Sequence, residues 1–339
     1  MLQIDTTLFT DSISEIAAIA KSAEALGFAG LITAEAQHDP YLPLMIAAEH
    51  TQRLDLLTGI AVAFPRSPMI TAYTAWDLQR YSSGRFLLGL GTQVKGHNER
   101  RFSVPWDRPV PRLRDLIRGL HAIWTCWQDG RPLNYQGEFY RFDLMTPFFS
   151  PGPNEHPRPP VYVAGVNRSI CRLAGELCDG FHVHPLHTRK YVDEVVKPLI
   201  AEGAKRSGRT ASDVKLVSAC FVVTGDDAEA MDTAAAAVKQ QIAFYASTRT
   251  YAPVLEAHGW EGIGPRLNEL SRTGRWGDMA DLISDDMLAE FAVIGPRDRV
   301  GSLLREKYDG LLDRISLYLP FRPGSDDDWW QDLVRTVTG

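Results

Sequence analysis

Short apolar runs alternate along the chain with longer segments whose apolar residues recur every three to four positions. Because the apolar runs lack the strict alternation of a half-exposed strand, they predict strands that are buried on both faces. We expect eight strands, at residues 2–9, 30–33, 55–64, 85–90, 161–164, 180–183, 215–223 and 314–319. We expect helices between them, at residues 13–26, 42–51, 71–81, 112–127, 169–177, 191–206 and 228–245, with a last helix opened by Pro296.

The first helix has signals at both ends. Ser12 and Glu15 have the spacing of a capping box, in which a hydroxyl and a carboxylate each satisfy an orphan N–H group. Gly27 follows the last apolar position and is expected to act as the C-cap.

Eight strands with interleaved helices favour a closed (β/α)8 TIM barrel over an open Rossmann sheet. We expect residues 1–339 to form one domain, with insertions after the fourth and seventh strands. The first insertion includes an irregular stretch at residues 91–110 and a hairpin at residues 134–140. The second, residues 247–290, is polar and rich in glycine, and we interpret it as a lid or an oligomer contact.

Composition narrows the class of protein. The net charge of −6 argues against nucleic acid as a partner, since phosphate-backbone affinity requires a basic surface. No apolar run approaches the roughly 20 residues that span a bilayer, and the first residues lack signal-peptide features. The four cysteines are scattered, which fits reduced thiols in the cytoplasm better than a disulfide framework. We therefore expect a cytoplasmic protein with neither membrane nor nucleic-acid partners.

Titratable and polar side chains gather where the predicted strands end. Active groups of such barrels project from the carboxyl ends of the strands. The candidates are Glu35, His38 and Asp39 after strand two, Gln93, Lys95, His97, Asn98 and Arg100 after strand four, Gly165, Asn167, Arg168 and Ser169 after strand five, and His182 and His184 on strand six. A purely structural barrel would not require so many ionisable groups on one rim.

Two of these features predict specific chemistry. A glycine between strand and helix, as at Gly165, lets backbone N–H groups approach an anion at the helix N-terminus, although the same turn also occurs without a ligand. His182 and His184 share one face of a strand and could bind a metal ion, as in metal-dependent hydrolases. Strand one has no histidine, however, so we expect no metal, and pocket-lining or structural roles remain open for this pair.

Several segments resemble the luciferase-like monooxygenase superfamily. Residues 84–91 (GRFLLGLG), together with Ser82, resemble its S-x-G-R-F-x-L-G-x-G hallmark. Residues 57–62 and 66–68 resemble its third-strand region, and residues 161–165, 172–176 and 179–180 resemble its phosphate-binding segment. These matches keep their order over residues 1–185. The resemblance supports the barrel and implies an oxidoreductase that uses a flavin or a deazaflavin.

Within that superfamily the chain looks most similar to the branch that depends on the deazaflavin coenzyme F420. Residues 35–40, 93–97 and 244–248 carry this resemblance. It implies a non-prolyl cis peptide bond between Gly59 and Ile60. It also implies cofactor contacts at Gly59, Ile60, Ala61, Thr92, Gln93, Val94, His97, Ala164, Gly165, Val166 and Asn167.

The predicted activity is hydride transfer between F420 and a small organic substrate, and a homodimer is expected from the resemblance. The chain departs from some relatives, which place an Asp-His pair where this sequence has Glu35-Ala36. Glu35 and His38 are the candidate catalytic groups for proton transfer because they follow strand two at the rim, and salt-bridged or solvated roles remain open for both. The alternatives are an FMN-dependent monooxygenase, a metal-dependent hydrolase and a flavin-binding protein without enzymatic activity.

Overall fold

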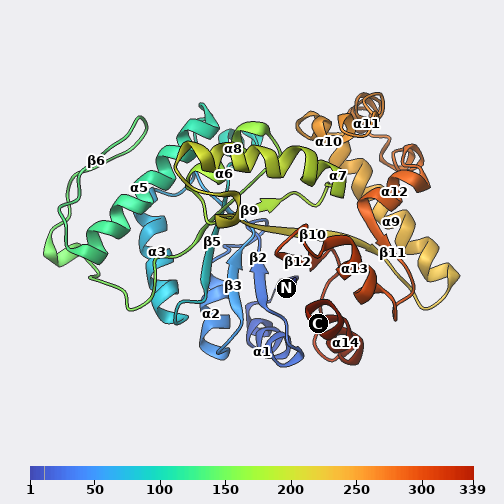
Figure 1. Cartoon of the computed structure of the whole chain (residues 1–339), viewed down its shortest axis with the longest axis horizontal. Coiled ribbons are helices and arrows are strands. Elements are labelled where there is room, and N and C mark those ends of the chain that lie inside the picture. Colours follow the sequence, from blue (N-terminus) through green and yellow to red (C-terminus); the bar gives the residue numbers. More distant parts are fainter. Residues whose placement is uncertain (11) are drawn as a thin grey trace.

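A computed structural model describes residues 1–10 and 12–339 and shows a closed parallel barrel (Figure 1). The barrel strands, in their order around it, are β1 (Gln3–Thr7), β2 (Gly30–Thr33), β3 (Asp55–Thr58), β5 (Phe86–Gly91), β8 (Val161–Gly165), β9 (Gly180–Val183), β10 (Lys215–Val223) and β12 (Arg314–Leu317). Each strand is parallel to its neighbour, and β12 pairs with β1 to close the ring. The predicted (β/α)8 barrel is confirmed.

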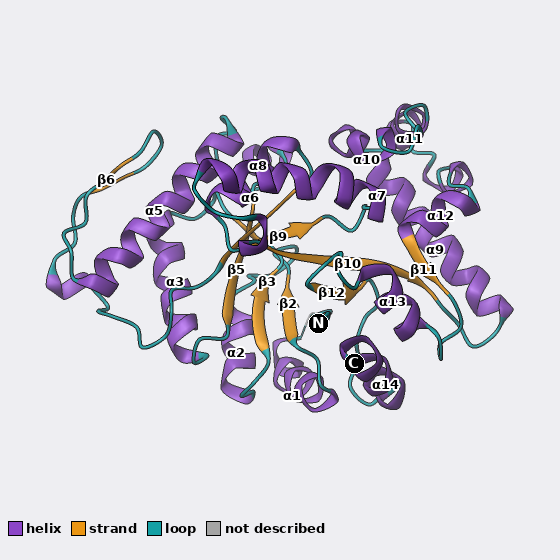
Figure 2. Ribbon diagram, in the orientation of Figure 1, coloured by secondary structure: helices purple, strands orange, loops and turns teal. Residues whose placement is uncertain are grey.

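Helices cover the outer face of the barrel and form most of its two insertions (Figure 2). They are α1 (Ile16–Leu26), α2 (Leu42–His50), α3 (Pro68–Tyr81), α4 (Lys95–Arg100), α5 (Pro109–Asp129), α6 (Arg168–Leu177), α7 (Arg189–Tyr191), α8 (Lys197–Arg206), α9 (Ala228–Ala246), α10 (Ala252–Glu256), α11 (Ile263–Arg272), α12 (Asp285–Phe291), α13 (Val300–Tyr308) and α14 (Asp327–Thr338). Four short strands complete the set: β4 (Ala61–Val62), β6 (Tyr135–Gln136), β7 (Arg141–Phe142) and β11 (Ala292–Ile294).

The two insertions lie where the sequence predicts them. After the fourth barrel strand, β5, the chain forms α4, α5 and the antiparallel hairpin of β6 and β7, which lies beside α5 away from the barrel (Figure 2). After the seventh, β10, helix α9 leads into α10, α11 and α12. Asn268 of α11 donates a 2.9 Å hydrogen bond to the carbonyl of Ser247 at the end of α9, so the second insertion is fastened to a barrel helix.

Two predictions about helix starts are wrong. Ser12 and Glu15 do not form a capping box: the Ser12 hydroxyl pairs with Ser14, Glu15 accepts from Thr10, and a short 3-10 turn precedes α1. Helix α13 begins at Val300 rather than at Pro296, because Pro296 opens a turn. Gly27, in contrast, is confirmed as the left-handed C-cap of α1, with φ of 90°.

The arginine of the family hallmark fastens the amino-terminal end of the barrel. Arg85 donates to the carbonyls of Ala48, Thr51 and Leu54, at 3.3, 2.9 and 2.6 Å, and so ties the end of α2 to the beginnings of β3 and β5. In TIM barrels this end serves stability, whereas the opposite end carries the chemistry. Arg85 therefore has a structural role.

A buried ionic cluster fills the barrel on the same side. Arg314 of β12 donates to Asp5 of β1 at 2.6 Å and to Asp55 of β3 at 2.7 Å. A side chain at Gly30 would lie 2.6 Å from the guanidinium, so glycine makes room for the cluster. These contacts raise the pKa of Arg314, while burial raises that of Asp55. The cluster blocks this end, which leaves the carboxyl end as the open mouth.

Candidate active site

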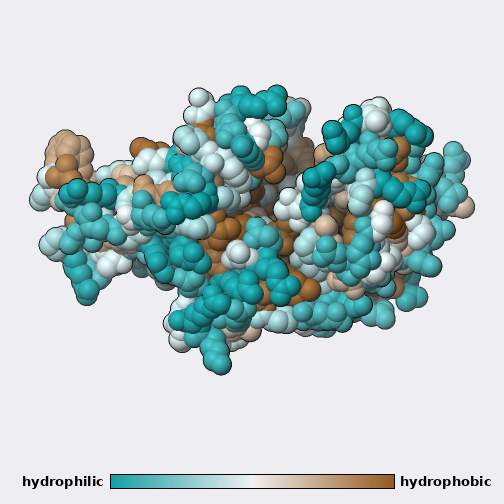
Figure 3. Space-filling model, turned by 90° about the horizontal axis from the view of Figure 1, so that it is seen from above, coloured by the Kyte–Doolittle hydropathy of each residue, from teal (hydrophilic) through white to brown (hydrophobic). Residues whose placement is uncertain are grey.

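A cavity of about 340 Å³ lies at the carboxyl ends of the strands. It is lined by residues of β1, β2, β8, β9, β10 and β12, and by the turn that follows β3. Figure 3 views the molecule from above, the side toward which these strands run, and shows a hollow with apolar side chains around it. The volume falls within the range of small-molecule sites, about 300–1,000 Å³.

A larger cavity, about 710 Å³, lies among the end of α9, α10 and α11. Its charged lining residues include Arg249 and Arg272, which are exposed, and no barrel strand contributes to it. Because the groups that could perform chemistry converge at the strand ends, the smaller cavity is the better candidate site.

The turn after β3 forms one wall of the cavity. The peptide bond between Gly59 and Ile60 is cis, as the family resemblance implies. Both residues line the cavity. Two glycines of β5 make room behind them: a Cβ at Gly89 would lie 1.8 Å from the Thr58 carbonyl oxygen, and one at Gly91 would lie 2.7 Å from the Ile60 side chain.

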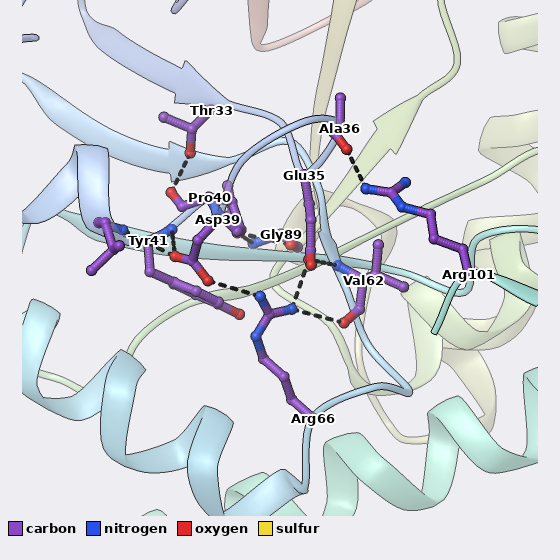
Figure 4. Close-up of polar contacts among 12 residues, drawn as sticks. Thr33, Glu35, Ala36, Asp39, Pro40, Tyr41, Val62, Arg66, Gly89 and Arg101 are labelled. Carbon is purple, nitrogen blue, oxygen red and sulfur yellow. Dashed lines mark hydrogen bonds and ion pairs between the residues drawn. The ribbon is translucent and has the colours of Figure 1, made fainter. Parts of the chain in front are cut away.

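Glu35 fastens this wall to the loop after β2 (Figure 4). Its backbone N–H donates to the carbonyl of Ile60 at 3.0 Å, and its carboxylate accepts from the N–H of Val62 at 2.7 Å. Arg66 donates to the same carboxylate oxygen at 2.7 Å and to Asp39 at 2.9 Å. The Glu35 side chain is only 7% exposed. This carboxylate is thus engaged by Val62 and Arg66, and it does not line the cavity.

The other predicted catalytic residue, His38, lies exposed in the same loop and does not line the cavity either. Arg101, which follows α4, donates to the carbonyl of Ala36 in this loop. The loop that carries His38 is therefore tied both to the turn after β3 and to the first insertion.

The predicted cofactor contacts divide into two groups. Gly59, Ile60, Ala164 and Gly165 line the cavity together. The rest are outside its lining: Ala61 in β4, Thr92, Gln93, Val94 and His97 after β5, and Val166 and Asn167 before α6.

The residues outside the lining still lie at the carboxyl end of the barrel. Buried Asn98 donates to the carbonyls of Thr92 and Val94, at 2.9 and 3.1 Å, and so fixes the turn after β5. Asn167 caps α6 by accepting from the N–H of Ile170 at 2.9 Å, so its amide oxygen serves its own helix.

Histidines form the floor and a side of the cavity. His182 is at the floor, and its Nε2 atom is buried without a hydrogen-bond partner among the described residues. His184 lies two residues further toward the mouth. Burial lowers the pKa of His182 to about 4 and that of His184 to about 3, so both rings are neutral at pH 7. Over residues 1–10 and 12–339, no group of three or more His, Cys, Asp or Glu side chains is placed to hold a metal ion.

The comparison with protein families identifies the scaffold. The model of the luciferase-like monooxygenases matches residues 2–314. The chain belongs to this family. It is therefore an oxidoreductase of the luciferase-like class, and the cavity at the strand ends is its candidate active site.

Two relatives in sequence and one solved structure are similar to this chain. An uncharacterized protein of Mycobacterium tuberculosis is 46% identical over 314 residues, which cover 93% of this chain and 92% of the relative. A 5,10-methylenetetrahydromethanopterin reductase of Archaeoglobus fulgidus is 27% identical over 271 residues, 78% of this chain and 77% of the relative. The solved structure of the coenzyme F420 dependent tetrahydromethanopterin reductase from Methanopyrus kandleri superposes with a TM-score of 0.78 at 22% identity, covering 99% of this chain and 98% of that one.

Sequence reasoning included residues 244–248 in the family resemblance but assigned no aromatic side chain to this luciferase-like site. Tyr245, at the end of α9, and Tyr318, just after β12, line the cavity, and their hydroxyl groups are 2.8 Å apart. Tyr318 directly follows the last barrel strand, so the rule of strand ends could have found it. Tyr245 lies at the far end of a 19-residue helix, and no local pattern places it at the mouth.

Proposed function

We propose that the protein transfers a hydride between coenzyme F420 and a small organic substrate. The similarity to methylenetetrahydromethanopterin reductases, in sequence over more than three quarters of the chain and in fold over nearly all of it, carries the proposal. The position of Gly59 and Ile60 in the wall of the cavity supports it, because the resemblance to F420-dependent enzymes implies cofactor contacts at these residues.

The cavity fits the flat ring of a deazaflavin. Backbone and small side chains supply much of its lining, including Ala34, Gly59, Ala164, Gly165 and Ala219, so a planar group can approach the walls closely. His182 closes the floor beneath such a ring, with its Nε2 atom buried against Gly89 of β5. Bound there, the cofactor would accept or donate a hydride, while the protein orients the substrate and excludes water.

Cations around the mouth could neutralise the phosphate and the glutamyl tail of F420. Arg100 of α4 and Arg168 at the start of α6 are exposed, and neither forms an ion pair within the described residues. The N-terminus of α6, next to Gly165, adds a partial positive charge. We propose that this region binds the phosphate, and that Thr92, Gln93, Val94 and His97 contact the cofactor from the opposite loop.

The two candidate catalytic groups receive different roles. Glu35 is paired with Arg66 and with the backbone of Val62, which supports a positioning role for it. His38, exposed on the loop between Glu35 and Asp39, remains our candidate for exchanging a proton with solvent. Hydride transfer itself requires no side chain as donor.

We further propose a homodimer. Apolar side chains of α2 and α3 are exposed on the surface: Leu42 is 60%, Met45 37% and Ile70 56% exposed. Phe148 and Phe149 of the first insertion are exposed as well, and Tyr73 of α3 donates to the Phe149 carbonyl, which places that segment beside α3. An exposed apolar surface of this kind is typical of a protein–protein contact.

A cytoplasmic location fits the cysteines. All four are buried and free, and burial raises the pKa of each thiol. None of the described helices is long and apolar enough to cross a membrane.

Parallel titrations of the purified apoprotein with F420 and with FMN, followed by fluorescence, test the proposal. We expect F420 to bind at least tenfold more tightly than FMN. Preference for FMN would assign the protein to the monooxygenases for which its family is named, and binding of neither would refute the cofactor assignment.

A further inference from the structure

His184 is a hydrogen-bond donor that the protein itself does not use. Its Nδ1 atom accepts the backbone N–H of Leu186 at 3.1 Å, so in the neutral ring the proton is on Nε2. Nε2 has no hydrogen-bond partner among the described residues, and the side chain lines the cavity. Because burial and His187 lower the pKa of His184 to about 3, the ring stays neutral near pH 7.

Two tyrosines hold this ring in place. Tyr245 meets it edge-on, with ring centroids 4.6 Å apart and planes at 86°. Tyr251 lies closer to parallel, at 4.3 Å and 31°. A ring fixed on both sides and at Nδ1 has little freedom to turn, so the direction of Nε2–H is set before a ligand arrives.

The position of His184 in the barrel separates it from the cis turn. Counting strands around the ring, the turn follows the third strand, and the strand opposite is the seventh, β10. His184 follows β9 and Tyr318 follows β12, the two neighbours of β10, while Tyr245 belongs to the helix after β10. A flat ring against Gly59 and Ile60 would therefore leave these three side chains facing its other side.

We propose that His184, with the Tyr245–Tyr318 pair beside it, forms a substrate subsite that binds an oxygen atom on the carbon that exchanges the hydride. The inference rests on the proposed function. It identifies the substrate class as carbonyl compounds in one direction and alcohols in the other. A neutral imidazole that donates a hydrogen bond and keeps its proton polarises a carbonyl without forming a cation. An apolar cavity with a few fixed donors is selective for such a ligand, because a shape-matched hydrocarbon leaves the donors unsatisfied.

Nitrogen-15 NMR of the full-length protein, labelled at histidine, tests the subsite directly. The probes are cyclohexanone and methylenecyclohexane, which have nearly the same shape but differ in the acceptor oxygen. We expect the His184 signals at pH 7 to show the Nε2–H tautomer, and the Nε2 signal to shift with cyclohexanone only. Loss of the signal in His184→Gln assigns it, with His50→Gln, an exposed residue at the end of α2, as the matched control.

Three results would overturn the subsite: an Nδ1–H tautomer, equal shifts with both probes, or no shift with either. A second readout is the dissociation constant of cyclohexanone, measured by calorimetry with and without F420. We expect His184→Phe to raise the dissociation constant of cyclohexanone about tenfold and to leave that of methylenecyclohexane unchanged. Equal changes for both probes contradict the proposal. Because the NMR experiment needs no cofactor, a failure of F420 binding is distinguishable from a failure of the subsite.

Discussion

At the scale of single residues, Glu35 shows how contacts can distinguish a positioning role from a catalytic one. Its carboxylate is shared between the backbone N–H of Val62 and the guanidinium of Arg66. Removing it would leave the N–H of Val62 and part of the Arg66 charge unsatisfied in a half-buried environment. The geometry of the cavity wall then depends on a residue that does not itself line the cavity.

We expect Glu35→Ala to lower the free energy of unfolding by about 2–3 kcal/mol and to weaken F420 binding, because it unpairs a buried N–H and a guanidinium. Glu49→Ala, an exposed glutamate of α2, should change stability by less than about 0.5 kcal/mol. Urea denaturation and F420 titration measure both. If Glu35→Ala keeps full stability and cofactor affinity but loses turnover, Glu35 is a proton donor and the positioning role is wrong.

A second residue-scale prediction concerns the glycines behind the wall. Gly89→Ala should destabilise the protein by about 3 kcal/mol or more, because the new methyl group would lie 1.8 Å from the Thr58 carbonyl oxygen. Gly96→Ala is the matched control: nothing lies within 4 Å of its Cβ position, and alanine favours the helix by up to about 1 kcal/mol. Equal urea midpoints for the two variants would contradict the prediction, because they would show that β3 and β5 can move apart at no cost in stability.

At the scale of elements, the barrel was predictable because buried parallel strands and amphipathic helices each leave a periodic signal. The predicted residues 215–223 coincide with β10, and residues 180–183 with β9. The failures occur where contacts distant in sequence decide. The capping box does not form because Glu15 accepts from Thr10 and Ser12 pairs with Ser14. The short strand β11 was not predicted, and it pairs with the end of β10.

The residues of the candidate site also divide into those that the sequence predicts and those that only the fold brings together. Gly59, Ile60, Ala164 and Gly165 were predictable because they lie at or just after the ends of strands that match the family motifs. The partner of Glu35 was not, because Arg66 lies 31 positions away and only the fold brings the two side chains together. The contact between Tyr245 and Tyr318, 73 positions apart, is of the same kind.

At the scale of the whole molecule, buried neutral histidines make stability depend on pH. The pKa values of His121, His182 and His187 are lowered to about 4, and that of His184 to about 3, from 6.5. Below pH 6.5 the unfolded chain binds protons that the folded state rejects, so stability is complete above pH 6.5 and falls as the pH drops toward 4.

We therefore expect the free energy of unfolding to fall by about 1.4 kcal/mol per pH unit for each such histidine in that window. Urea denaturation between pH 7 and pH 4.5 measures the slope. His121→Gln should reduce this slope by about 1.4 kcal/mol per pH unit, the contribution of one histidine. His50→Gln, on the surface of α2, should leave the slope unchanged. A slope that His121→Gln does not change would show that burial does not lower the pKa of His121 in the folded state.

The proposed dimer is tested at this scale too. Ile70→Asp places a charge in the exposed apolar surface of α2 and α3, so we expect sedimentation to show a shift from dimer toward monomer. The surface of α1 offers the control, Lys21→Asp, at an exposed polar position. A wild-type protein that sediments as a monomer, or an Ile70→Asp dimer as stable as the wild type, would contradict this interface.

The most direct test of the central claim is a crystal structure of the protein in complex with F420. We predict that the deazaflavin ring lies against Gly59 and Ile60 in the cavity at the strand ends, with His184 on its other side and the phosphate near the start of α6. A ring bound elsewhere, such as among α9, α10 and α11, would contradict the account.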